Sequence, residues 1–339
     1  MSKATLMITL LFFLAMVGAY SVYKPFLLSI TVAILLSMAT FNLTNQLIAF
    51  TRSSKVSAML STLVLSLLLF APIVYLATVG VGYIGHLDAK GIQEMFSQIK
   101  ESIDQVSYLK ELSQQYLSDE KIALYIKDAT SYLTTVSGMG FGFVKNMLFV
   151  VVFYFFINYY GNRFFDTILA LLPVSPSRGA KMIQEVSATM EIVFYSIIVT
   201  AIFEGLLFGI IVSYFGLNGL LFGVIYGFAS LIPIIGGVVV WAPVTLYAWT
   251  KIDTQTALII MGYSIVMISI IADTFIKPMI IQVIKEDFLK STIQINPILI
   301  FFSILAGMST YGFWGMILGP AVTSFLIAIT KVYLDYSEK

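Results

Sequence analysis

The sequence of 339 residues contains no cysteine and a single histidine, His86. Disulfide bonds and thiol chemistry are therefore excluded for this chain, and so is a zinc site built from histidine and cysteine ligands. Charge is also scarce, because Asp, Glu, Lys and Arg make up 11% of the residues, whereas a soluble domain averages about 25%. The net charge of +1 indicates no basic surface, so we expect no nucleic-acid partner.

Catalytic and nucleotide-binding motifs are absent as well. The sequence has no HExxH, no GxSxG and no P-loop pattern, so nothing indicates a hydrolase or an ATP-driven pump. We predict that the protein is not an enzyme and that it holds no cofactor and no metal. Any work that requires energy would then draw on an ion gradient or on a partner protein.

Apolar residues make up 59% of the chain and are gathered into long runs. We therefore predict an all-α fold, a polytopic helical membrane protein with about six full spans, two broken re-entrant helical hairpins and an extramembrane amphipathic helical insert. The predicted spans are Thr5–Tyr23, Phe26–Phe50, Ser57–Gly85, Phe143–Tyr160, Ser177–Phe215 and Ala257–Asp273. The first run has two interpretations, a signal peptide or a retained helix, and we favour the helix because a second span follows directly after Lys24-Pro25.

Two further apolar stretches are interrupted by helix-breaking residues. Gly216–Thr250 is broken at Ser230–Gly237, where Pro233 lacks a backbone donor and Gly236 and Gly237 permit unusual backbone angles. Asn296–Thr330 is interrupted at Asn296-Pro297 and by later residues, namely Gly307, Gly312, Gly315, Gly319 and Pro320. Paired broken segments are typical of a transporter's binding site. We predict a hairpin for each stretch, while hydropathy alone also fits two full spans for each.

One polar segment separates the apolar regions. Residues His86–Ser137 hold eight acidic and five basic side chains, and apolar residues follow one helical face, namely Ile92, Met95, Phe96, Ile99, Ile103 and Val106. We predict amphipathic helices outside the bilayer, packed together or lying on its surface, and a flexible turn at Gly138–Gly142. The predicted domains are N-terminal transmembrane helices (1–85), an extracytoplasmic insert (86–142) and a C-terminal transport core (143–339) with hairpins at 216–250 and 296–330.

Several short motifs occur in fixed order in the C-terminal half. They are Phe153–Phe156 with Arg163 and Leu171-Leu172-Pro173, the glycine-rich Gly216–Gly237, DTFIKP at Asp273–Pro278, Asn296-Pro297, and GFWGMILGP at Gly312–Pro320. Over residues 143–333 this pattern resembles the autoinducer-2 exporter (AI-2E) transporters, also called PerM-like permeases. The chain departs from the family pattern at Glu204-Gly205, where members often have Gln-Gly, and at Asn296, where His is common.

The resemblance implies a multi-pass transporter of the bacterial cytoplasmic (inner) membrane. Members of the family are linked to export of the furanosyl quorum-sensing signal or to sodium–proton antiport. It also implies a homo-oligomer, with a pentamer as one form. The distribution of Lys and Arg along the chain itself predicts that the N- and C-termini are cytoplasmic.

Candidate solute- or ion-binding residues come from the charges and the breaks. Glu204 lies midway along a predicted span, and is either a proton or cation site or a protonated acid bonded to a neighbouring helix. Asp273 and Lys277 are four residues apart, and either form an ion pair at a helix end or serve a cavity. The residues at the breaks either bind a polar solute through their backbone and side chains or form structural turns. These residues are Ser230, Pro233, Gly236, Gly237, Asn296 and Pro297.

Two ladders of small residues predict close helix packing. They are Gly205 with Gly209, and Gly219 with Gly223 and Gly227. We hypothesise an AI-2E-like permease that exports a small polar solute, such as a quorum-sensing signal, with ion coupling through the carboxylates. The alternatives are a sodium (cation)/proton antiporter and, in another class, a structural membrane protein whose insert docks a partner. The expected partners are the lipid bilayer and a small polar solute, a monovalent cation or a proton.

Overall fold

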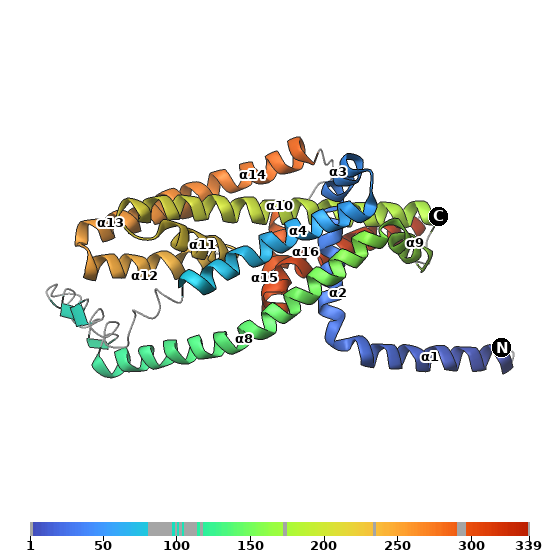
Figure 1. The fold of residues 1–339 in the computed structure, drawn as a ribbon, viewed down its shortest axis with the longest axis horizontal. Coiled ribbons are helices and arrows are strands. Elements are labelled where there is room, and N and C mark those ends of the chain that lie inside the picture. The colour runs from blue at the N-terminus through green and yellow to red at the C-terminus, as the bar shows by residue number, and fades with distance from the viewer. Residues whose placement is uncertain are drawn as a thin grey trace. The chain divides into compact units, whose positions relative to one another are not determined.

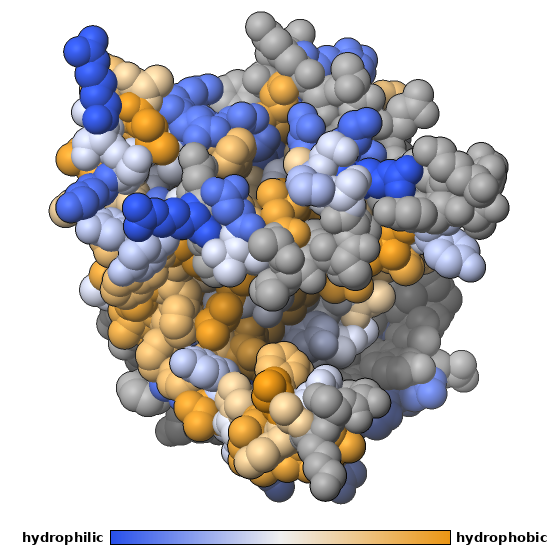
Figure 2. All heavy atoms as spheres, turned by 90° about the vertical axis from the view of Figure 1, so that its right-hand side faces the viewer, coloured by the Kyte–Doolittle hydropathy of each residue, from blue (hydrophilic) through white to orange (hydrophobic). Residues whose placement is uncertain are grey.

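A computed structural model describes residues 3–80, 97–98, 100–101, 104, 114–115, 118–171, 175–232, 235–289 and 296–337. Within these ranges every regular element is a helix, and six helices are long and apolar enough to cross a membrane. Large apolar side chains such as Phe12, Leu63 and Ile210 are exposed, and the face drawn in Figure 2 has many apolar side chains at its surface. Lipid solvates such side chains, so the predicted fold class, a polytopic helical membrane protein, is confirmed.

The six candidate spans differ in part from the predicted ones. They are Ala4–Ala39, Ser54–Val79, Gly142–Tyr160, Pro176–Tyr214, Thr254–Glu286 and Ile298–Thr330. The first joins α1 (Lys3–Tyr23) to α2 (Leu27–Ala39) through the 3-10 turn η1 (Lys24–Phe26). Figure 1 shows the chain bending sharply there, where Pro25 cannot donate the hydrogen bond that would continue α1. The predicted single span Phe26–Phe50 is wrong, because Thr40 separates α2 from α3 (Phe41–Thr51).

The chain forms two compact units. Unit 1 comprises Met1–Leu63, Gly142–Met190 and Ala306–Lys339, and unit 2 comprises Val64–Phe141 and Glu191–Leu305. Four helices contribute to both units, namely α4 (Ser54–Tyr75), α8 (Asp119–Tyr160), α10 (Pro176–Tyr214) and α15 (Pro297–Tyr311). The π-helical η2 (Leu76–Gly80) extends α4 in unit 2, and α9 (Asn162–Leu171) belongs to unit 1.

Unit 1 contains buried polar side chains where α2 ends. Thr40 has φ −117° and ψ 17°, and its hydroxyl lies 2.8 Å from the carbonyl oxygen of Leu36 and 2.7 Å from the hydroxyl of Tyr154 on α8. Ser37 donates to Oδ1 of Asn158, also on α8, over 3.0 Å. These four polar side chains are all buried. Lipid cannot form hydrogen bonds with these polar groups. They therefore bond to one another, and these bonds hold α2 against α8.

Helix α8 runs through Gly138–Gly142 without interruption, so the predicted flexible turn is wrong. The helical hydrogen bonds of the aromatic span simply continue into the preceding segment. About half of residues 86–137 lie outside the described residues, including all six residues of the predicted apolar face.

The second broken stretch is a hairpin whose turn lies in unit 1. Its arms are α15 and α16 (Gly315–Ser337), joined by the 3-10 turn η5 (Gly312–Trp314). Gly312 has φ +58°, a left-handed conformation that suits glycine. A side chain on Gly307 would collide with the carbonyl group of Gly315, so the two arms pack backbone to backbone.

The first broken stretch is a hairpin in unit 2. It consists of α11 (Gly219–Ala229) and α12 (Gly236–Lys251), so the break falls within the predicted Ser230–Gly237. Figure 1 shows the two helices side by side, and α13 (Thr254–Tyr263) follows α12 after a tight turn. Asp253 in that turn caps α13 by accepting the amide hydrogen of Thr256, with 2.7 Å between nitrogen and Oδ1.

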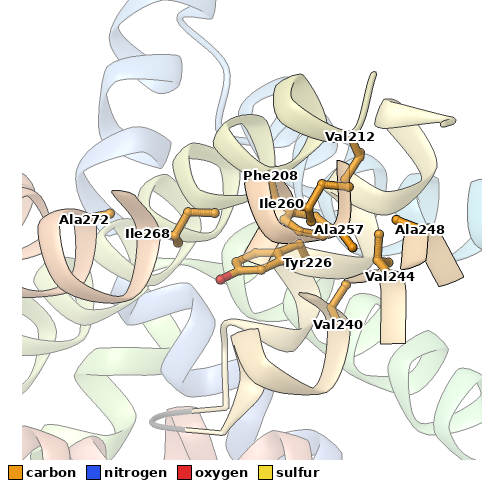
Figure 3. Close-up of a cluster of buried hydrophobic side chains, with 10 residues drawn as sticks. All are labelled: Phe208, Val212, Tyr226, Val240, Val244, Ala248, Ala257, Ile260, Ile268 and Ala272. Atoms are coloured by element: carbon orange, nitrogen blue, oxygen red, sulfur yellow. The ribbon is translucent and has the colours of Figure 1, made fainter. Parts of the chain in front are cut away.

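A buried apolar cluster joins this hairpin to its neighbours in unit 2. Its members come from α10, α11, α12 and the helix that begins with α13, and they are labelled in Figure 3: Phe208, Val212, Tyr226, Val240, Val244, Ala248, Ala257, Ile260, Ile268 and Ala272. The rings of Phe208 and Tyr226 stack with centroids 4.6 Å apart. Burial of these side chains positions α11 and α12 against α10.

The helix after the hairpin is longer than predicted. α13 continues through π-helical η3 (Ser264–Ile276), α14 (Lys277–Val283) and π-helical η4 (Ile284–Phe288). The prediction that the sixth span ends at Asp273 is wrong. Apolar residues continue after Lys277, among them the buried Ile284, and the charge of Lys277 has partners.

Candidate functional site

The candidate site in unit 2 is centred on a buried carboxylate. Glu204 lies in α10, within a helix of 39 residues that is long enough to cross a membrane, and its side chain is only 4% exposed. An ionised carboxylate at such a place costs several kcal/mol unless a cation compensates it. The compensating cation is Lys277, whose Nζ lies 2.8 Å from Oε1 of Glu204.

Glycines bring the hairpin into direct contact with the helix that carries Glu204. A Cβ atom built on Gly205 would lie 2.5 Å from the carbonyl oxygen of Gly223, and one on Gly209 would lie 2.6 Å from that of Gly219. A Cβ on Gly227 would lie 2.7 Å from the carbonyl oxygen of Ala201. The structure therefore brings the two predicted glycine ladders together, and we call this contact between α10 and α11 the glycine seam.

The seam determines where the end of α11 lies. Ser230, the first residue after α11, donates its hydroxyl to the carbonyl oxygen of Gly227 over 3.0 Å, and the same hydroxyl approaches the carboxylate of Glu204. A Cβ on Gly237 would lie 2.5 Å from the hydroxyl oxygen of Tyr226, and a side chain on Gly236 would collide with the carbonyl group of Ala229. The structure thus places Ser230, Gly236 and Gly237 together around the break.

Lys277 lies on the long helix that begins with α13. Its Nζ donates to Oδ1 of Asp273 over 2.7 Å, in addition to its contact with Glu204. The side chain of Asp273 is 47% exposed and that of Lys277 is 32% exposed. The three side chains form one charged group, which we call the charge cluster, with its carboxylates on two different helices.

The charges of this cluster do not balance. With both carboxylates ionised, two negative charges face one ammonium, so the cluster carries a net charge of −1. In surroundings of low polarity the coulombic energy between such groups is large, and a further cation or a proton would neutralise the cluster. The arrangement can therefore bind or release one positive charge.

Tyr226 is a residue near the site that the sequence analysis missed. Its ring belongs to the apolar cluster (Figure 3), and its hydroxyl oxygen lies at the break, 2.5 Å from a Cβ atom built on Gly237. Tyr226 precedes Ser230 by one helical turn, so both project from one side of α11. That spacing was the signal available in the sequence.

Two further predicted site residues lie at the start of α15, and one is not described. Asn296 caps α15, with its Oδ1 accepting the amide hydrogens of Ile298 at 3.0 Å and Leu299 at 3.4 Å. Pro297 is the first residue of α15, a position where its missing donor costs nothing. The turn of that hairpin is at Gly312, so the prediction that Asn296 lies at its break is wrong. Pro233 lies outside the described residues.

Comparison with known proteins decides the family. A family model described as AI-2E family transporter matches residues 6–335. The chain belongs to the AI-2E family. The motif resemblance over residues 143–333 is confirmed, and the match extends it to almost the whole chain.

Similar proteins occur in Helicobacter pylori and Aquifex aeolicus. Two Helicobacter pylori proteins, from strains J99 and 26695, are each 31% identical to this chain over 344 aligned residues, which cover 98% of this chain and 97% of the relative. A protein of Aquifex aeolicus strain VF5 is 23% identical over 53% of this chain and 48% of its own length. All three carry the description "Putative transport protein".

Proposed function

We propose that this AI-2E family protein is a secondary transporter that exports a small polar solute and couples the export to a proton or a monovalent cation. The observation that carries the proposal is the buried carboxylate of Glu204, which pairs with Lys277 beside the break of the α11–α12 hairpin. An ionisable group inside apolar helices is a typical ion-coupling group. We assign the protein transport and no catalytic role.

The length of α11 supports a solute path at this break. With 11 residues at about 1.5 Å per residue, α11 is about 16 Å long, which is half of the roughly 30 Å hydrocarbon core. A helix of that length ends inside the membrane, and its partner α12 then returns to the same side. The backbone groups at the break and the hydroxyl of Ser230 are available there to bind a polar solute.

Flux through reconstituted vesicles tests the coupling. The furanosyl quorum-sensing signal suggested by the family resemblance is the first test solute, with an imposed proton or sodium gradient. We expect the gradient to accelerate flux in the wild type and in Glu185→Gln, a change of another acid on α10. Glu204→Gln should keep a basal flux that no longer responds to the gradient. Equal gradient responses in Glu204→Gln and the wild type would remove Glu204 from the coupling.

A cation/proton antiporter is a second candidate, favoured by the uncompensated negative charge of the cluster. Glu204 and Asp273 would then carry either a sodium ion or protons in turn. This function predicts that sodium drives proton release from vesicles that contain no organic solute. A pH-sensitive dye inside the vesicles measures this, and no sodium-dependent signal would argue against antiport.

We further propose a place in the bacterial inner membrane, cytoplasmic termini and a homo-oligomer. Arg52, between α3 and α4, and Lys55, in the first turn of α4, support a cytoplasmic loop there. Since the chain has no cysteine, single engineered cysteines at residue 53 and near each end can be labelled from one side without background. Labelling of these sites from the outside of intact cells would contradict the orientation, and a monomeric mass in mild detergent would contradict the homo-oligomer.

A further inference from the structure

The two carboxylates that contact Lys277 differ in how they are attached to it. Asp273 lies one turn before Lys277 on the same helix, so this pair persists when the helix moves. Glu204 lies on α10, so the 2.8 Å contact between Lys277 and Glu204 breaks when the two helices separate. The ammonium therefore has one partner that moves with it and one that does not.

The two carboxylates also differ in their surroundings. The side chain of Glu204 is 4% exposed, whereas that of Asp273 is 47% exposed, and the ammonium lies between them. The hydroxyl of Ser230, directly after α11, also approaches the carboxylate of Glu204. This hydroxyl carries no positive charge, so Lys277 supplies the positive charge at this buried carboxylate.

The regular backbone hydrogen bonding of the helix that carries Lys277 is interrupted next to this residue. The amide of Lys277 bonds to the carbonyl oxygen of Ala272 as the last bond of π-helical η3, and Pro278 has no amide hydrogen to continue the series. Changes from π- to α-helical geometry and prolines both mark places where a helix bends. The ammonium can thus be moved by a small bend next to its own backbone.

We propose that Lys277 is a tethered cation that occupies the Glu204 carboxylate in this conformation and that the coupling ion displaces it toward Asp273. When a proton or a monovalent cation binds Glu204, Asp273 and Lys277 remain as a neutral pair, so the charge cluster changes from −1 to 0. The ion and the ammonium therefore compete for one carboxylate. This inference rests on the proposed function, because it assigns Lys277 a role in the exchange of the coupling ion.

Removal of the positive charge of Lys277 should allow a free cation to bind the carboxylate of Glu204. In the full-length protein in detergent, Lys277→Met keeps an unbranched side chain but removes the charge. Sodium chloride is titrated against choline chloride at constant ionic strength, and the melting temperature is measured. We expect sodium to raise the melting temperature of Lys277→Met with a half-saturating concentration at least ten-fold lower than in the wild type.

Two control variants test the assignment of this response. Lys285→Met removes another lysine from the same helix and should behave as the wild type does. Glu204→Gln/Lys277→Met removes the carboxylate as well and should lose the sodium response. A Lys277→Met protein with no sodium response, or with the wild-type half-saturation, would overturn the tethered-cation role.

Chemical labelling tests the displacement without changing Lys277. Acetic anhydride modifies lysine amines, and mass spectrometry reports the extent at each lysine. In Glu204→Gln the ammonium keeps only the exposed partner Asp273, so Lys277 should be modified several-fold faster than in the wild type, with Lys285 as the unchanged internal reference. An unchanged rate at Lys277 overturns the inference even when Lys277→Met does not fold.

The flux assay separates the failure of this inference from the failure of the proposed function. A wild-type protein with no solute or ion flux in vesicles would remove the proposed function and, with it, the role of Lys277 in exchange. Wild-type flux together with an unchanged sodium affinity in Lys277→Met would remove the role of Lys277 alone.

Discussion

The close contact at the glycine seam predicts that a larger side chain at Gly205 lowers the free energy of unfolding. In Gly205→Ala the new methyl group would lie 2.5 Å from the carbonyl oxygen of Gly223, about 0.9 Å short of the 3.4 Å at which ordinary contact begins. Overpacking of this kind costs about 1–3 kcal/mol, while alanine gains roughly 1 kcal/mol over glycine in helix propensity. We therefore expect Gly205→Ala to lower the free energy of unfolding by about 1 kcal/mol, up to about 2.

A matched control lies in the same unit. Gly262 is in α13, where an added Cβ atom would meet nothing within 4 Å, so Gly262→Ala should raise the free energy of unfolding by up to about 1 kcal/mol. Both variants are measured by an unfolding titration in mixed detergent micelles. Trp241 and Trp249 in α12 provide a fluorescence signal for this unit. Vesicle flux is measured in parallel, since a displaced α11 moves Ser230 away from Glu204.

The double variant decides whether the two glycines act at one contact. Methyl groups on Gly205 and Gly223 would widen the same gap, so the cost of Gly205→Ala/Gly223→Ala should be less than the sum of the single costs. A Gly205→Ala protein as stable as the wild type would refute the reasoning. So would a loss of equal size in Gly262→Ala.

Three further predictions concern other parts of the molecule. Tyr154→Phe removes the hydroxyl that lies 2.7 Å from that of Thr40, and the unfolding titration should show a loss of about 0.5–1 kcal/mol; no loss would contradict a stabilising role of this contact. Gly312→Ala should lose about 1 kcal/mol because φ is +58°, and Gly312→Asn should lose less because asparagine tolerates this conformation; equal losses would contradict the argument. Hydrogen bonds from the side chain and then the backbone amide of Thr256 hold the pKa of Asp253 below its usual value. The cap is therefore complete above the unfolded pKa of about 3.9 and is lost as the pH falls through the folded pKa, so amide exchange at Thr256 should accelerate in acid in the wild type but not in Asp253→Asn.

The sequence predicted the helices and the breaks better than it predicted the site. Long apolar runs and their interruption by glycine and proline are local signals, and the break after Ala229 lies where they indicated. The end of the sixth predicted span was placed too early, because Asp273 and Lys277 lower the local hydropathy. The helix continues because Asp273 and Lys277 pair with each other and Lys277 also pairs with Glu204.

The pairing of Glu204 with Lys277 could not be derived from spacing. The i, i+4 rule finds partners on one helix, and it correctly related Asp273 to Lys277. A contact between two helices depends on how they pack, and 73 positions separate Glu204 from Lys277 along the chain. The available clue was a balance of charge, because a buried acid on one span requires a cation from another.

The site combines a closely packed side with a side that can bend. On one side, the glycine seam joins α10 to α11 backbone to backbone, so Glu204 and Ser230 stay together. On the other side, the helix that carries Lys277 passes from π- to α-helical geometry directly before Pro278 and lacks a hydrogen bond there. A change of charge at Glu204 should therefore move Lys277 and its helix rather than the hairpin. This asymmetry requires that Gly205→Ala disturb stability and solute flux together, whereas the stability that Lys277→Met loses should depend on the sodium concentration.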